Sequence, residues 1–135
     1  MSCPAPSEDA LSVLLYTSGT TGKPKGVPRT HRAERVAAVA HAVQTRQRQG
    51  ERVLGVMPMF HTMGLRTLLC SIVVGGTWVA QPAFDADAAT ALIVDEGVSS
   101  LYLVPTMYWS LLRAGGLERA RSLDRLAHAG AAVTP

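Results

Sequence analysis

Residues 16–27 combine side chains that bind phosphate with residues that let a backbone turn tightly. They read Tyr-Thr-Ser-Gly-Thr-Thr-Gly-Lys-Pro-Lys-Gly-Val and follow an apolar run that is typical of a β-strand. Glycines allow a close backbone approach to a ligand, and successive N–H groups in such a turn form a concavity for anions. Hydroxyls add hydrogen-bond donors, and lysine adds positive charge. This chemistry suits a polyphosphate, most simply ATP.

The segment matches neither of the two common phosphate-binding fingerprints. The P-loop requires Gly, four residues and then Gly-Lys-Ser/Thr, but Pro24 or Val27 occupies the second glycine position in the two possible registers. The dinucleotide pattern G-x-G-x-x-G fails because Thr21 stands where a glycine is needed. A flexible surface loop is the alternative, but the mixture of hydroxyls, glycines and lysines favours phosphate binding. The predicted phosphate-binding residues are Thr17, Ser18, Gly19, Thr20, Thr21, Gly22 and Lys25.

The elements that must position this segment follow from the spacing of apolar residues. Runs typical of strands alternate with segments in which apolar residues recur every three to four positions, as in amphipathic helices. Thr30 and Asp85 are suited to cap helix N-termini, and Pro105 is suited to a first helical turn. We predict strands at residues 11–16, 26–30, 52–57, 77–81, 99–104 and 126–129, and helices at residues 31–49, 63–74, 85–96 and 105–114.

Alternating strands and helices predict an α/β fold. The sheet is expected to be largely parallel, with helices layered on both faces. Ligands bind beyond the carboxyl ends of the strands in such sheets. Four segments with chemistry directly follow predicted strands, namely residues 16–27, residues 58–64, Pro105 and Gly130. We therefore expect all four segments at one edge of the sheet, in one composite site.

Composition places the chain among globular proteins. Its 135 residues suffice for one domain, 47% of them are hydrophobic, and the net charge is only +3. Arg66 and two glycines interrupt the apolar stretch at residues 65–80, so we expect no membrane span. Cys3 and Cys70 lack metal-ligand spacing and favour a reduced, cytoplasmic protein. Residues 1–10 have no signal-peptide pattern and are expected to form a loose N-terminus.

The helix predicted at residues 31–49 carries arginines on one side and apolar residues on the other. No aromatic residues alternate with these arginines and no nucleic-acid-binding module is recognisable, so we expect a solvated face and no nucleic-acid partner. The four histidines lack metal-ligand spacing, so no metal ligands are predicted. The inward face of the helix is predicted to consist of Val36, Val39, Ala40 and Val43, and Gly50 is predicted to end it.

Residues 16–27 resemble the phosphate-loop signature of the adenylate-forming superfamily, which comprises acyl- and aryl-CoA ligases, luciferases and the adenylation domains of peptide synthetases. Three further segments, at residues 58–64, 101–107 and 128–132, resemble other signatures of this family in the expected order. They read Pro-Met-Phe-His-Thr-Met-Gly, Leu-Tyr-Leu-Val-Pro-Thr-Met and His-Ala-Gly-Ala-Ala. Residues 32–36, 76–79 and 100–102 look most like 4-chlorobenzoate-type aryl-CoA ligases. The resemblance covers nearly the whole chain and implies that residues 1–135 are part of a larger AMP-binding N-terminal domain.

The resemblance implies ATP-dependent activation of a carboxylate. The carboxylate would attack the α-phosphate to give an acyl-adenylate and pyrophosphate, and CoA or another thiol would then displace AMP. Family members also use Mg²⁺, but the Tyr-Gly-x-Thr-Glu segment that serves adenine and magnesium is not in this chain, nor is the C-terminal lysine. We therefore expect part of a ligase that is inactive alone. The alternative is a non-catalytic nucleotide-binding or interaction module derived from the same fold.

The resemblance also implies roles for individual residues. Lys25 would bind the β- and γ-phosphates together with the loop, and His61 would orient the acyl group or the adenylate. From the sequence alone, His61 is as readily a structural histidine that bonds to backbone. Gly130, Ala131 and Ala132 would lie against adenine, although the proline that the family has soon after this glycine comes only at Pro135. The pocket for an aromatic or medium-sized carboxylate is predicted to be lined by His61, Met63, Tyr102 and His41.

Overall fold

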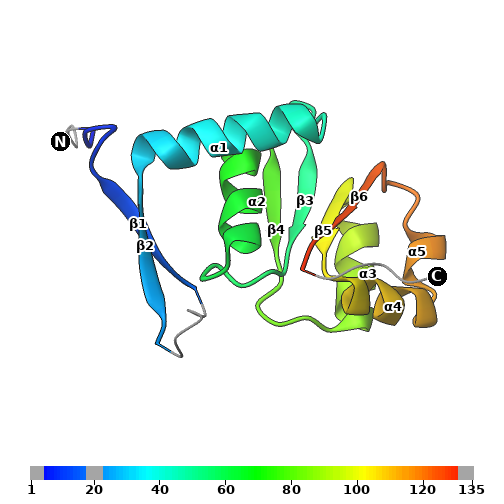
Figure 1. The fold of residues 1–135 in the computed structure, drawn as a ribbon. Helices are drawn as coiled ribbons and strands as arrows, with labels where there is room; N and C mark the ends of the chain where they lie inside the picture. The colour runs from blue at the N-terminus through cyan, green and yellow to red at the C-terminus, as the bar shows by residue number, and fades with distance from the viewer. Residues whose placement is uncertain (1–4, 18–22, 131–135) are drawn as a thin grey trace.

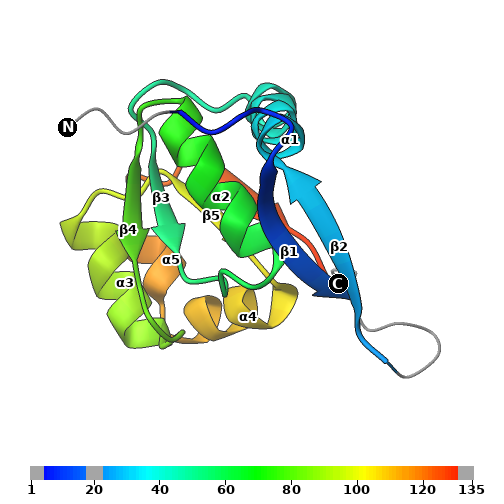
Figure 2. The ribbon, with the colours of Figure 1, turned by 90° about the vertical axis from the view of Figure 1, so that its left-hand side faces the viewer.

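The computed structural model describes residues 5–17 and 23–130, which form a hairpin and a helix-covered sheet (Figures 1 and 2). The antiparallel hairpin consists of β1 (Leu11–Thr17) and β2 (Lys25–Thr30). The parallel sheet has the order β4-β3-β5-β6 and contains β3 (Arg52–Gly55), β4 (Thr77–Ala80), β5 (Ser100–Leu103) and β6 (Arg125–His128). The helices are α1 (His31–Gln44), α2 (Thr62–Val73), α3 (Ala86–Asp95), α4 (Pro105–Arg113) and α5 (Gly116–Arg119). The predicted α/β fold, with a largely parallel sheet layered by helices, is confirmed.

Helices cover both faces of the parallel sheet. α2 packs against β3 and β4, with α1 lying against α2, while α3, α4 and α5 pack together on the other face (Figures 1 and 2). The core on that second face contains Leu54, Leu101 and Leu103 from the strands with Ile93 and Leu111 from the helices. These side chains are at most 1% exposed, and burying each one contributes about 1.5–3 kcal/mol. This packing fixes the positions at which β3 and β5 end.

Several element boundaries follow from local signals that the sequence contains. The Thr30 hydroxyl accepts a hydrogen bond from the Ala33 N–H at 3.2 Å, and the Asp85 carboxylate accepts one from the Ala88 N–H at 2.8 Å. Pro105 is the first residue of α4, as predicted. The predicted bounds of the strands differ from the observed ones by at most two residues, as at the end of β3. The short helix α5 was not predicted, because it has only four residues.

The hairpin corrects the prediction that all four segments lie at one edge of the parallel sheet. Among the described residues β1 pairs with β2 alone, and the pair at the end of β1 is Thr17 with Lys25. A crossover between parallel strands needs a dozen or more residues, so the short connection after Thr17 can join only antiparallel strands. The other three segments follow β3, β5 and β6 and lie at the carboxyl ends of these strands, as expected.

The buried face of α1 differs from the predicted one. Val36, Val39 and Val43 are 58%, 43% and 72% exposed. Alanines instead let α2 approach closely, and the Cys70 thiol of α2 donates a hydrogen bond to the Ala38 carbonyl oxygen at 3.3 Å. The prediction of a valine face was therefore wrong, and the buried residues of α1 are Glu34, Ala38 and Ala42.

The C-terminus of α1 also comes earlier than predicted. The helix ends at Gln44, and Arg46 adopts the left-handed conformation with φ of 53°. That conformation is rare for a residue with a side chain, so the sequence favoured Gly50 as the residue that ends the helix.

Before α1, Glu8 and Asp9 pair with Arg32 at 3.0 Å each. None of the described helices is long and apolar enough to cross a membrane.

A tyrosine connects the two C-terminal strands and gives the fold a testable pH dependence. The Tyr108 hydroxyl lies 2.8 Å from the Ala127 carbonyl oxygen and 3.0 Å from that of Leu101. Burial raises the pKa of Tyr108 to about 12. The folded state therefore holds this proton more tightly than the unfolded chain, whose tyrosine pKa is about 10.

We expect stability to fall as the pH rises from about 10 to about 12, by about 2 kcal/mol in the wild-type chain. The contribution of Tyr108 is complete below the unfolded-state pKa and is lost as the pH passes the folded-state value. Urea unfolding at pH 8 and pH 11.5 measures this loss of stability, with Tyr108→Phe as the matched variant. The two chains should differ in this pH dependence, and equal losses would contradict the assignment. All other titratable groups are common to the two chains, so the difference between them isolates Tyr108.

Candidate functional site

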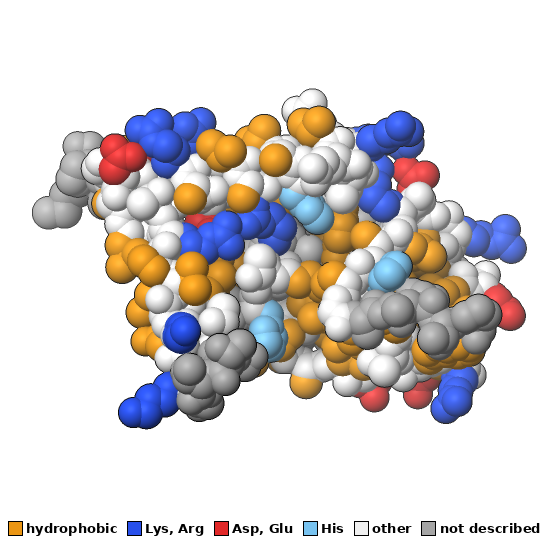
Figure 3. Space-filling view, viewed as in Figure 1, with side chains coloured by type: hydrophobic (Ala, Val, Ile, Leu, Met, Phe, Trp, Pro, Cys, Tyr) orange, Lys and Arg blue, Asp and Glu red, His pale blue; other side chains and the backbone are white. Residues whose placement is uncertain are grey.

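A cavity of about 760 Å³ lies among α1, the N-terminal half of α2 and the carboxyl ends of β5 and β6. Apolar atoms form most of its wall. The space-filling view shows a hollow with apolar side chains in it and histidines around it (Figure 3). Arg66 is the only Lys, Arg, Asp or Glu side chain among its described lining residues. The cavity is therefore suited to the apolar part of a small molecule, with polar groups at a few places.

Five of the predicted site residues meet in this cavity. His61, Met63, Tyr102 and Gly130 all line it, although they come from three separate parts of the chain. His41, which was also predicted as a pocket wall, lines it from α1.

The predicted phosphate-binding residues have a different location. Thr17 and Lys25 are exposed at the end of the hairpin and do not line the cavity. Ser18, Gly19, Thr20, Thr21 and Gly22, and likewise Ala131 and Ala132, lie outside the described residues.

His61 is positioned by the turn between β3 and α2. It is the N-cap residue of α2, with extended backbone, and its N–H donates to the Pro58 carbonyl at 3.0 Å. A side chain at Gly64 would bring a Cβ within 2.2 Å of that same carbonyl oxygen, so the turn requires glycine there. The His61 ring lies 4.7 Å from the Phe60 ring between centroids. Its imidazole makes no capping hydrogen bond to the backbone of α2.

Tyr102 forms a fixed wall of the cavity. Its hydroxyl accepts a hydrogen bond from Gln47 Nε2 at 2.7 Å and lies 3.4 Å from the Thr45 hydroxyl. The ring centroids of His41 and Tyr102 are 5.4 Å apart. These contacts join the end of α1 to β5, and the phenol oxygen makes its hydrogen bonds within the protein. Tyr102 therefore shapes the cavity.

A charged side chain that lines the cavity, Arg66, and a buried carboxylate next to it, Glu34, were not expected from the sequence. The buried carboxylate of Glu34 contacts Arg29 and lies 3.7 Å from an Arg66 nitrogen. These are ion-pair contacts, and neither Glu34 oxygen has a partner with hydrogen-bond geometry among the described residues. Glu34 lies on the face of α1 that carries Ala38 and Ala42, and Arg66 interrupts an apolar helix. In the sequence, the positions of Glu34 and Arg66 were the only indication of this ion pair.

The charge of Arg66 affects its titratable neighbours. Burial and the nearby Arg66 guanidinium lower the pKa of His41 below its usual value. Both effects favour the neutral form of His41. Burial raises the pKa of the Cys70 thiol, although Arg66 opposes part of this shift. A thiolate is the reactive form of cysteine, so Cys70 is a packing residue. The described residues contain no group of three or more His, Cys, Asp or Glu that could hold a metal ion.

Comparisons with known proteins agree with the resemblance in the sequence. A family model described as "AMP-binding enzyme" matches residues 2–135. The 4-chlorobenzoate–CoA ligase of Arthrobacter sp. is 35% identical over 134 residues, which cover 96% of this chain and 26% of that enzyme. A long-chain-fatty-acid–CoA ligase of Mycobacterium tuberculosis is 42% identical over 94 residues, which cover 70% of this chain and 19% of that enzyme.

Solved structures show the same relationship. The unliganded o-succinylbenzoate CoA synthetase of Bacillus subtilis superposes with a TM-score of 0.83 and 30% identity, covering 96% of this chain and 26% of that one. The same enzyme in complex with AMP also gives a TM-score of 0.83, with 34% identity. The chain thus spans about a quarter of the length of the curated relatives it matches. It belongs to the family of AMP-binding, adenylate-forming enzymes.

Proposed function

We propose that this chain is the part of an acyl- or aryl-CoA ligase that binds the carboxylate substrate and the phosphates of ATP. The observation that carries the proposal is the cavity, because it joins His61, Met63, Tyr102 and Gly130 at the carboxyl ends of parallel strands. This is the edge at which α/β sheets bind ligands. Its mainly apolar wall supports an aromatic or medium-sized carboxylate.

The reaction has two steps. A carboxylate oxygen attacks the α-phosphorus of ATP, and the bond to pyrophosphate breaks. The thiol of CoA, or of another carrier, then attacks the acyl carbonyl, and AMP leaves. Both steps depend on alignment and on neutralisation of phosphate charge.

In this proposal each group of residues has one role. His61, exposed at the cavity mouth, orients the acyl group or the adenylate, and Gly130 with Ala131 and Ala132 contacts adenine. Lys25, with Thr17, Ser18, Gly19, Thr20, Thr21 and Gly22, holds the β- and γ-phosphates. The o-succinylbenzoate CoA synthetase of Bacillus subtilis has been solved in complex with ATP and a magnesium ion, but the described residues offer no carboxylate cluster for Mg²⁺. We therefore assign no step to Mg²⁺ in this chain.

We further propose that residues 1–135 form part of a larger N-terminal domain. The chain covers only about a quarter of its relatives, and the lysine of the family's C-terminal domain is not in it. We call the longer enzyme that would contain these residues the complete ligase. The free, buried thiol of Cys70 is consistent with a reduced, cytoplasmic protein.

Carboxylate-dependent exchange of pyrophosphate into ATP tests this proposal. We expect the complete ligase to catalyse exchange with at least one aromatic or medium-chain acid, and the isolated 135-residue chain to catalyse none. We expect no exchange by the isolated chain because its residues would bind the β- and γ-phosphates but do not include the groups that neutralise charge at the α-phosphorus. Clear exchange by the isolated chain would contradict the proposed division. Nucleotide binding in calorimetry without any exchange by the complete protein would instead indicate a non-catalytic nucleotide-binding module.

A further inference from the structure

One full positive charge lines the otherwise uncharged cavity. Arg66 lies on α2, one helical turn after Thr62, and its side chain is only 12% exposed. Around it the described wall consists of Ala, Met, Thr, Val, Tyr, Gln, Gly and His residues. A guanidinium in such surroundings is costly unless anions or hydrogen-bond acceptors pair with it.

The protein supplies only part of the charge that this site needs. Glu34 is the one carboxylate within ion-pair distance of Arg66 among the described residues, and it also contacts Arg29. Two guanidiniums therefore share one carboxylate, which leaves one positive charge in excess. At 3.7 Å the contact between Arg66 and Glu34 is longer than a hydrogen bond, so Glu34 satisfies the charge of Arg66 only in part and satisfies none of its N–H donors.

The position of the three side chains shows where a balancing anion would have to lie. Glu34 is buried and does not line the cavity, and Arg29, whose side chain is 23% exposed, does not line it either. Only Arg66 faces the cavity. Arg29 alone would suffice to neutralise Glu34, so internal charge balance gives no reason for Arg66. An anion that completes the cluster must therefore approach Arg66 from the cavity.

We propose that Arg66 recognises a second carboxylate, at the end of the substrate farthest from the carboxyl group that reacts. The substrate class is then a dicarboxylic acid whose two acid groups are separated by an aromatic ring or a medium-length chain. Arg66 lies five residues beyond His61, about 7–8 Å along the helix axis, which fits such a separation. Guanidinium binds carboxylate in two parallel hydrogen bonds, which gives geometric as well as charge selectivity.

This inference rests on the proposed function, and it makes Arg66 a determinant of substrate specificity. His41 also lines the cavity, and its lowered pKa favours the neutral imidazole, which attracts an anion less than Arg66 does. The pKa of His41 also reports on the charge of Arg66, because that guanidinium is one of the two causes that lower it. Removal of the charge should raise the His41 pKa toward its usual value, which NMR titration can follow.

Pyrophosphate exchange by the complete ligase with matched acids tests the inference. Octanedioate is compared with octanoate, and 4-carboxyphenylacetate with phenylacetate. The wild-type enzyme should prefer the diacid of at least one pair by 10-fold or more in kcat/KM. Arg66→Met should lower kcat/KM for that diacid about 10- to 100-fold and leave or improve the value for its monoacid. Arg66→Lys keeps the charge and should retain part of the preference.

The controls separate the possible failures. Arg121→Met removes an exposed arginine outside the cavity and should leave all ratios unchanged. A wild-type preference for both monoacids, or equal losses for diacid and monoacid in Arg66→Met, would overturn the role of Arg66 while the proposed function stands. Failure of every acid to support exchange would overturn the proposed function instead. If Arg66→Met does not fold, the wild-type ratio and Arg66→Lys still decide.

Discussion

Replacement of Lys25 by alanine is expected to slow carboxylate-dependent pyrophosphate exchange by the complete ligase about 100-fold, the usual effect of losing one preorganised charge-stabilising group. Lys25 is exposed opposite Thr17, at the position where the hairpin opens into the loop. In the described part of the chain it takes part in no ion pair, so its ammonium group is available to phosphate. Adenosine binding should change little, because the lysine acts on phosphate.

The adjacent lysine provides a matched control. Lys23 is also exposed. If its ammonium group remains in solvent and does not contact phosphate, Lys23→Ala should change the exchange rate by less than about 3-fold, because interactions of exposed charges are screened. Thr20→Ala should resemble Lys25→Ala if its hydroxyl binds phosphate. Thermal unfolding checks that the variants fold alike. Unchanged exchange in both Lys25→Ala and Thr20→Ala would end the phosphate assignment of the hairpin loop.

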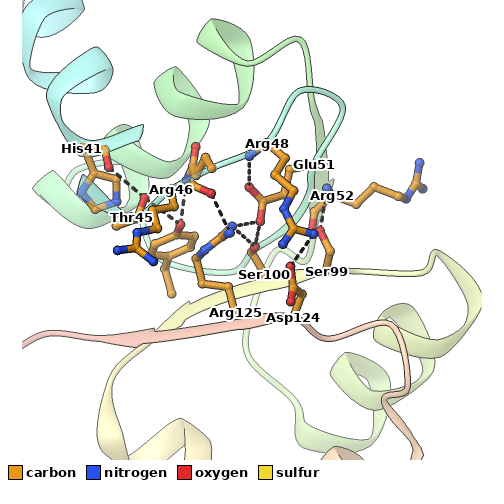
Figure 4. Close-up of polar contacts among 12 residues, drawn as sticks. His41, Thr45, Arg46, Arg48, Glu51, Arg52, Ser99, Ser100, Asp124 and Arg125 are labelled. Carbon is orange, nitrogen blue, oxygen red and sulfur yellow. Dashed lines mark hydrogen bonds and ion pairs between the residues drawn. The ribbon is translucent and has the colours of Figure 1, made fainter. Parts of the chain in front are cut away.

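Replacement of Glu51 by alanine is expected to lower the free energy of unfolding by about 3 kcal/mol. Glu51, Ser100 and Arg125 point toward one another where β3, β5 and β6 begin (Figure 4). One Glu51 oxygen contacts Ser100 and Arg125, and the other accepts a hydrogen bond from the Arg48 N–H at 3.1 Å. The Glu51 and Arg125 side chains are only 4% and 15% exposed, so alanine would leave a nearly buried guanidinium unpaired.

The same cluster holds the irregular connection between α1 and β3. The other Arg125 nitrogen donates to the Arg46 carbonyl at 2.7 Å, next to the left-handed backbone of that residue. Glu51→Gln keeps hydrogen bonding but removes the charge, and should fall between the wild type and alanine. Arg48→Ala breaks an exposed pair with Asp124, at 2.9 Å, and should cost less than about 1 kcal/mol. Urea unfolding measures all three, and similar small effects of Glu51→Ala and Arg48→Ala would contradict the account.

Signals that act over a few residues were predictable from the sequence. Thr30 and Asp85 cap their helices because a short side chain can reach an N–H three residues later, and this depends only on the local order of residues. The alternation of strands and helices, read in the same way, gave the α/β fold. The cavity residues His61, Met63, Tyr102 and Gly130 could be predicted from the sequence because they follow or belong to predicted strands and helices.

Contacts between distant segments were not predictable in this way. The exposed valines of α1 repeat at helical spacing, but which face is buried depends on α2 and on the small side chains of Ala38 and Ala42. The Glu34–Arg66 pair needs two helices to meet, and the Glu51–Arg125 pair joins residues 74 positions apart. The antiparallel hairpin was missed because its two strands were read as part of the alternating pattern, although their short connection excludes a crossover.

The identity of the released nucleotide is the most direct test of the central claim that this cavity belongs to an adenylate-forming ligase. The complete ligase would be incubated with ATP, an aromatic or medium-chain acid and CoA, and its products identified by mass spectrometry. Attack on the α-phosphorus predicts AMP, pyrophosphate and an acyl-CoA, and formation of all three should depend on the acid. ADP and phosphate as the acid-dependent products, or nucleotide release that does not depend on any acid, would contradict the account.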